Sequence, residues 1–172
     1  MTDEIRAHLR AHFGRDPDVA SVTFVGLQPI DVLRFGPDDD GVTSYVSVGG
    51  SRHAEGTPAE VAVSLRAGSV LKGLARSVAV LAAAPAVEGL VLTPDALVDL
   101  GQSLWQGAPF TAILLGRSEI QPVENMEFLQ AIPITANEAA WVRLKGPDAM
   151  REAWRQDGVD VLDPARPAAR PS

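Results

Sequence analysis

The chain contains no cysteine, which excludes disulfides, thiolate metal ligands and cysteine nucleophiles together. It also has no long apolar run. The most apolar window, residues 78–92, is interrupted by Pro85, Glu88 and Gly89 and is too short to span a bilayer. The first residues, MTDEIRAHLRAHF, carry acids and lack an apolar core, so no signal peptide is predicted. We therefore expect a soluble cytoplasmic protein without membrane association.

Positive charge is in deficit, with 15 Lys and Arg residues against 22 Asp and Glu residues and a net charge of −7. Electrostatic binding to nucleic acid needs clustered positive charge, so nucleic acid is not an expected partner. The acidic balance would attract a basic protein, although ordinary solubility explains it equally well. An apolar fraction of 46% with 22% charged residues is sufficient to form a core, and the 172 residues fit one domain.

Catalytic and ligand-binding motifs are missing as well. No glycine-rich phosphate loop occurs, and the neighbouring Ser51 and His53 lie in GGSRH rather than in a Gly-x-Ser-x-Gly elbow. His8 and His12 have the spacing of two metal ligands on a helix but lack the glutamate of a zinc protease. The run Asp38–Asp39–Asp40–Gly41 lacks EF-hand spacing and fits a hairpin turn. The sequence thus predicts no catalytic residue, no metal site and no cofactor.

Hydrophobic periodicity places the first elements. Alternating apolar residues and turn signals predict a helix and then an antiparallel meander of four strands. The helix spans residues 2–13, and the strands span residues 19–27, 30–35, 42–48 and 59–66. A second helix is predicted from Ser69 to Pro85, with Val70, Leu74 and Val78 on its buried side.

The second half of the chain contains further strands and two more helices. Residues 96–100 fit a helix, whereas residues 102–105 fit a short strand, and the pattern does not decide between them. Strands are predicted at residues 110–115 and 123–134, and a final helix begins at Pro147. From Pro164 onward, proline, alanine and arginine dominate, which predicts a frayed tail. Strands grouped apart from helices indicate a single-domain α+β fold.

The corner at residues 127–141 is the best-specified stretch. Residues 128–132 read as a buried strand, and Pro133 is expected to stop sheet hydrogen bonding because it has no N–H. Thr135 and Glu138 have the spacing of a capping box, in which each side chain bonds the backbone N–H of the other residue. We expect Glu138 to be occupied by this cap at the start of a helix over residues 136–144.

Three landmarks, in this order and spacing, resemble the suppressor-of-fused-like domain family, in its stand-alone bacterial form. They are YVSVGGS at residues 45–51, EVAV at residues 60–63 with the helix that follows, and FLQAIPIT at residues 128–135 with Glu138 and a later Asp160–Arg166 segment. The resemblance covers residues 3–166. It implies a central, mostly antiparallel sheet flanked by helices, with residues 1–166 forming the domain and residues 167–172 a disordered tail.

The resemblance also implies protein binding without catalysis. Eukaryotic members hold a transcription factor in an inactive complex, and bacterial stand-alone domains look like immunity proteins. We therefore expect a domain that binds and sequesters or inhibits a partner protein, such as a basic toxin, and that is a monomer or weak dimer. The alternative is a small-molecule-binding protein or enzyme with a pocket near Trp105 and His53.

Two polar loops next to strand ends are the predicted partner contacts, because exposed loops on a rigid scaffold commonly bind ligands. The first loop contributes acidic side chains and the second a mixed set. The residues are Asp38, Asp39 and Asp40 in the first loop, and Ser51, Arg52, His53 and Glu55 in the second.

Overall fold

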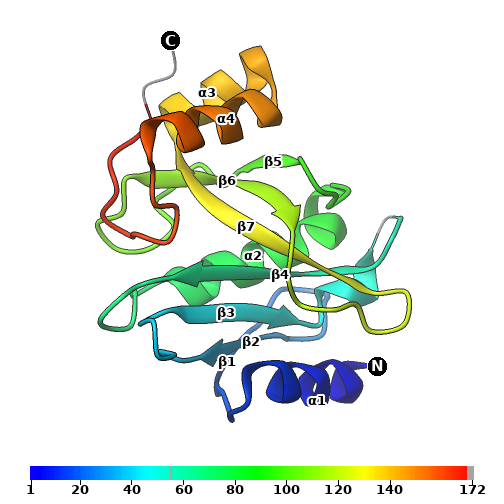
Figure 1. Ribbon diagram of the computed structural model, residues 1–172. Coiled ribbons are helices and arrows are strands. Elements are labelled where there is room, and N and C mark those ends of the chain that lie inside the picture. The colour runs from blue at the N-terminus through cyan, green and yellow to red at the C-terminus, as the bar shows by residue number, and fades with distance from the viewer. Residues whose placement is uncertain (55, 170–172) are drawn as a thin grey trace.

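The computed structural model describes residues 1–54 and 56–169, and a seven-stranded sheet with order β1-β2-β3-β4-β7-β6-β5 forms the centre of this part of the chain (Figure 1). Neighbouring strands are antiparallel except β4 and β7, which are parallel. The predicted α+β fold with a mostly antiparallel sheet is therefore confirmed. The strands are β1 (Asp18–Val22), β2 (Ile30–Phe35), β3 (Thr43–Val48), β4 (Ala59–Leu65), β5 (Leu97–Asp99), β6 (Phe110–Arg117) and β7 (Glu127–Thr135).

Helices cover the two faces of the sheet unequally. The helix α2 (Leu74–Glu88) packs on one face, against the side chains of Val61, Val63 and Leu65 in β4. The other face carries α1 (Thr2–Phe13) near β2 and β3, and α3 (Ala136–Lys145) with α4 (Pro147–Asp157) near β6 and β7. A single 3-10 turn, η1 (Gly50–His53), links β3 to β4.

Side-chain alternation along β7 shows that α1 and the α3–α4 pair lie on the same face. Phe128 belongs to the cluster under α1, and Ile134 belongs to the cluster under α3 and α4. These residues are six apart, so their side chains point to the same side of the sheet. Leu129 and Ala131 point to the opposite side and join the cluster under α2. Figure 1 shows α1 and the α3–α4 pair at opposite ends of the sheet.

The second helix begins later and ends later than predicted. Its first residue is Leu74, after Gly73 with φ of 97°, rather than a residue next to Ser69. Val70, expected on the buried side, is 60% exposed. The helix passes through Pro85 and ends at Glu88, with Gly89 as its C-cap, because a proline in the last turn removes only one N–H from the hydrogen-bond ladder. The predicted buried stripe through Leu74 and Val78 is confirmed.

Three strand predictions also need correction. The first strand ends at Val22, and the ambiguous region contains the short strand β5 at Leu97–Asp99 instead of either predicted element. The strand β7 continues through Pro133, which lies opposite Ile113 of β6. The proline is tolerated because the pairing with β4 ends at Gln130, so β7 has a neighbour on one side only at this point.

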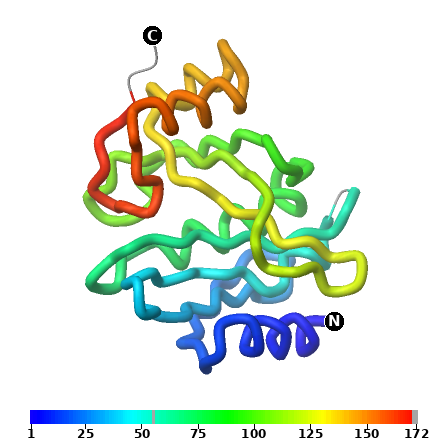
Figure 2. Tube along the Cα trace, in the orientation of Figure 1, coloured from blue at the N-terminus to red at the C-terminus, as the bar shows by residue number. Residues whose placement is uncertain are grey.

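The segment after α4 folds back onto the domain, as the orange-to-red tube in Figure 2 shows. Leu162 accepts a hydrogen bond from the N–H of Arg66 at 2.7 Å, just beyond β4. Arg166 and Ala169 are buried, so the expected fraying from Pro164 onward is wrong for these residues. The rest of the predicted tail, residues 170–172, lies outside the described residues. No helix in the described ranges has the length and apolar character that a membrane crossing needs.

Candidate functional site

The acidic turn of residues 38–40 joins β2 to β3 and is exposed, as predicted. Asp38 organises it, since its Oδ1 accepts hydrogen bonds from the N–H groups of Asp40 and Val42, both at 2.9 Å. This is the local side-chain-to-backbone bonding that favours aspartate in turns. Asp39 and Asp40 have no ion-pair partner within the described residues. The turn therefore presents negative charge to solvent.

The second predicted loop lies at the other end of β3. Ser51, Arg52 and His53 belong to η1, which follows the last residue of that strand, whereas Glu55 lies outside the described residues. Six strand residues separate the two loops, roughly 20 Å at the usual rise of a strand. The structure thus does not bring the two predicted contact groups together.

Glu60, in β4, fixes the conformation of η1. Its fully buried carboxylate accepts hydrogen bonds from the N–H groups of Gly49, Gly50 and Ser51 at 2.9, 3.2 and 3.0 Å. The hydroxyls of Ser47 and Ser51 donate to it at 2.7 and 2.6 Å. The sequence signal for this role was Glu60 itself, an acidic residue in an otherwise apolar strand.

Trp105 and His53, near which the sequence suggested a pocket, lie apart in the described part of the chain. Trp105 packs against Phe110 with ring centroids 5.5 Å apart, and Gly73 lies beside it at the start of α2. The turn that ends at His53 packs near Ala82, towards the other end of α2. About two helical turns separate the two regions. This separation does not support a single pocket shared by Trp105 and His53.

A hollow on the sheet face between α1 and α4 brings together residues that the sequence did not connect. It has a volume of about 590 Å³, and its floor is formed by side chains of β3, β4 and β7. Ser44, Ser64 and Gln130 make this floor polar, and Ile132 adds an apolar part. Its rim includes Asp38 of the acidic turn, together with His12, Phe13, Arg117, Glu119 and Ile120.

A second hollow of about 400 Å³ adjoins the first and shares Arg117, Gln130 and Ile132 with it. Its wall contains Arg151 of α4, whose guanidinium pairs with Asp95 at 2.5 Å and donates to the carbonyl of Leu115 at 3.1 Å. The two hollows share three lining residues, and we call them together the central cleft. Sequence reasoning missed it because its residues come from strands that are distant in the chain.

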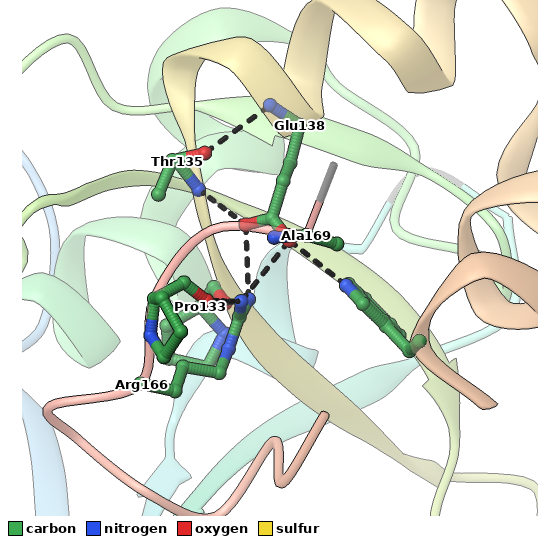
Figure 3. A network of polar contacts seen from close by, with 7 residues as sticks. Pro133, Thr135, Glu138, Arg166 and Ala169 are labelled. Atoms are coloured by element: carbon green, nitrogen blue, oxygen red, sulfur yellow. Dashed lines mark hydrogen bonds and ion pairs between the residues drawn. The ribbon is translucent and has the colours of Figure 1, made fainter. Parts of the chain in front are cut away.

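Glu138 has a larger role than the predicted cap. The capping box is confirmed, since the N–H of Glu138 donates to the Thr135 hydroxyl at 3.2 Å and the N–H of Thr135 donates to Glu138 at 3.0 Å. The same carboxylate also accepts from two nitrogens of Arg166, each at 3.0 Å, and from the Trp154 indole at 2.9 Å. Figure 3 shows these groups converging on one buried carboxylate.

Electrostatics explain why this buried acid stays ionised. Burial acts to raise the pKa of Glu138, but hydrogen bonds from Arg166, Thr135 and Trp154 outweigh it, and the net result is a lowered pKa. The guanidinium carbon of Arg166 also lies 4.9 Å from the centre of the Phe110 ring. The network therefore joins β7, α3, α4 and the C-terminal segment. It is a structural centre rather than an exposed site.

The fold defined by this sheet and its helices is shared with solved structures of suppressor-of-fused proteins. A homologue from Neisseria gonorrhoeae FA 1090 aligns with a TM-score of 0.79 and 19% identity, over 98% of this chain and 96% of that one. A structure described as the Sufu-Fu complex gives 0.69 and 14%, over 97% and 91%. Drosophila Suppressor of Fused gives 0.69 and 16%, over 96% of this chain and 50% of that one.

The family model for Suppressor of fused protein (SUFU) matches residues 26–167, most of the chain, and the protein belongs to this family. The three landmarks that suggested the resemblance all lie within the matched range. Among curated proteins, none matches the sequence.

Proposed function

We propose that this protein is a non-catalytic domain that binds a protein partner and blocks it stoichiometrically. The observation that carries the proposal is its family membership, because one structure of the same fold is described as a complex of Sufu with Fu. That relative is 14% identical to this chain, so the identity of the partner does not transfer.

The polar groups that resemble catalytic residues form hydrogen bonds that stabilise the fold, which supports a binding role. The hydroxyl of Ser51 is held by Glu60 and is not directed at His53 as a nucleophile would be. The carboxylates of Glu60 and Glu138 are fully buried and occupied by hydrogen bonds. A general acid or base must reach a substrate proton, and neither carboxylate is accessible for that.

Charge indicates the kind of partner. The net charge of −7 and the exposed Asp38, Asp39 and Asp40 favour a basic protein surface, because opposite potentials accelerate association. A basic toxin neutralised by an immunity protein in the cytoplasm is one partner of this kind. Ser51, Arg52, His53 and Glu55 form the second proposed contact region. A small partner would use one of the two regions, since they lie at opposite ends of β3.

The proposal is tested by capturing partners from the native cell with the tagged protein, purifying a retained candidate and measuring stoichiometry by calorimetry. We expect a 1:1 complex that weakens when Asp38, Asp39 and Asp40 are all changed to Asn. Light scattering of the free protein should give a monomer or a weak dimer. A folded protein that turns over a substrate and retains no partner would contradict the proposal.

A further inference from the structure

The central cleft is uncovered sheet with a polar floor, which distinguishes it from the rest of that face. On either side, α1 and the α3–α4 pair bury apolar clusters against the strands. Between them, Ser44, Ser64 and Gln130 occupy central strands, where apolar residues would be expected if another helix covered the face. The cleft is therefore built to meet water or a polar ligand.

The floor has hydrogen-bonding capacity left over within the described residues. Gln130 Nε2 donates to Ser64 Oγ at 3.2 Å, and the hydroxyls of Ser44 and Ser64 are 2.9 Å apart. Two hydroxyls carry two protons, and the bond between them uses one, so one O–H remains to donate. The Gln130 carbonyl oxygen has no hydrogen-bond partner among the described residues and remains to accept. A peptide group, which offers both a carbonyl and an N–H, satisfies both needs.

The rim of the larger hollow selects the side chain of the occupant. Asp38 and Glu119 make no ion pair in the described part of the chain, and Arg117 is the one arginine among the described residues that line this hollow. Phe13, Ile120 and Ile132 add apolar surface to the same hollow. Lysine and arginine suit such walls, because their aliphatic stems pack on apolar surface while their charged ends reach carboxylates.

From these observations we infer that the central cleft binds an extended segment of the partner protein, with a lysine or arginine side chain placed between Asp38 and Glu119. The inference rests on the proposed function and specifies its contact surface. The floor pairs with the peptide groups of the segment, and the rim sets the preference for positive charge. A volume near 590 Å³ lies within the roughly 300–1,000 Å³ that is typical of ligand sites.

The test uses three blocked peptides, acetyl-Gly-Arg-Gly-amide and its Glu and Leu counterparts, titrated into the isotope-labelled full chain at low salt. We expect the Arg peptide to shift amide signals of Ser44, Ser64 and Glu119 and the side-chain amide of Gln130. Its affinity should exceed that of the Glu peptide by at least about threefold. The preference should shrink as salt is added, because exposed charges are screened.

Matched variants distinguish binding in the central cleft from attraction to the negative charge of the protein as a whole. The double change Asp38→Asn and Glu119→Gln should abolish the charge preference, and the asparagine side chain still offers the turn a carbonyl oxygen as acceptor. Asp39→Asn with Asp40→Asn alters net charge equally on the same turn but does not line the hollow, so the preference should persist. Gln130→Leu should weaken all three peptides alike.

Scattered shifts, equal binding of the three peptides, or loss of the preference in the Asp39 and Asp40 control would overturn the inference. Peptide binding in the cleft without any captured protein would instead refute the proposed function and leave the cleft as a site for cationic ligands. If a captured partner binds the Asp38, Glu119 and Gln130 variants with unchanged affinity, it does not bind in the central cleft. The inference would then be wrong, and the proposed function would still stand.

Discussion

Glu60 and Glu138 are both fully buried carboxylates, and the protein stabilises them in different ways. Every described donor to Glu60 is an uncharged group within 13 residues of it, in β3, in η1 or at Gly49 between them. Glu138 instead faces a guanidinium 28 residues away, an indole in α4 and the N–H of Ala169. The first network shapes a loop, and the second fastens the end of the chain to the fold.

The difference shows that the kind of donor around a buried carboxylate depends on how far away in the chain its donors lie. Backbone N–H groups of a tight turn converge on one point, so Glu60 needs no cation. The donors around Glu138 come from separate elements, and a strong, directional partner is needed to hold them together. A bidentate guanidinium supplies that geometry.

The largest effect is expected from Arg166→Ala, which leaves the Glu138 carboxylate buried without its cation. Breaking a buried ion pair from one side costs about 3–5 kcal/mol, and urea unfolding should show a loss of this size. The matched control is Arg66→Ala, because Arg66 pairs with Asp160 at an exposed site. The control should cost less than about 1 kcal/mol. Similar losses of unfolding free energy in both variants would show that the buried Arg166–Glu138 pair stabilises the fold no more than an exposed ion pair does.

Glu60→Gln should cost about 2–3 kcal/mol, because the amide NH2 group would face backbone and hydroxyl donors that then lack an acceptor. Faster hydrogen exchange should be confined to Gly49, Gly50 and Ser51. The control is Glu127→Gln at the partly exposed start of β7, expected within about 0.5 kcal/mol of the parent. Exchange that quickens across the whole sheet would show that Glu60 supports the global fold instead of one loop.

Lowering the pH should weaken the Glu138 network more gradually than the substitutions above do. The pKa of Glu138 is lowered in the folded state, so its contribution to stability is complete above the ordinary value near 4.5 and is lost as pH falls through the folded pKa. One group changes stability by at most about 1.4 kcal/mol per pH unit. Urea unfolding between pH 6 and 3 should therefore be less pH-dependent in Glu138→Gln than in the parent. Parallel curves would contradict the ionised pair.

The smallest effect is expected from Thr135→Ala, which removes one side-chain cap and leaves the contacts of Glu138 with Arg166 and Trp154 in place. Loss of an N-cap hydroxyl costs about 1 kcal/mol. Combining it with Arg166→Ala tests whether the cap and the ion pair act through the same carboxylate. A purely additive double variant would separate the cap from the network.

Local sequence patterns predicted the elements that depend on neighbouring residues. The stripe through Leu74 and Val78 and the capping box of Thr135 and Glu138 were both found, because helix periodicity and capping involve residues three or four apart. Errors occurred where distant partners decide the outcome. Pro133 remains within β7 because β4 stops pairing before it is reached, and the pattern around the proline contains no information about that neighbour.

The family, the α+β class and the capped corner could thus be predicted from the sequence, since composition, order of elements and short spacings are properties of the chain. Tertiary structure alone decided that β4 lies beside β7, that Arg166 returns to Glu138, and that Ser44, Ser64 and Gln130 share one cleft floor. These features join residues up to 86 positions apart, from 44 to 130. Such contacts arise from the packing of whole elements, which no local pattern encodes.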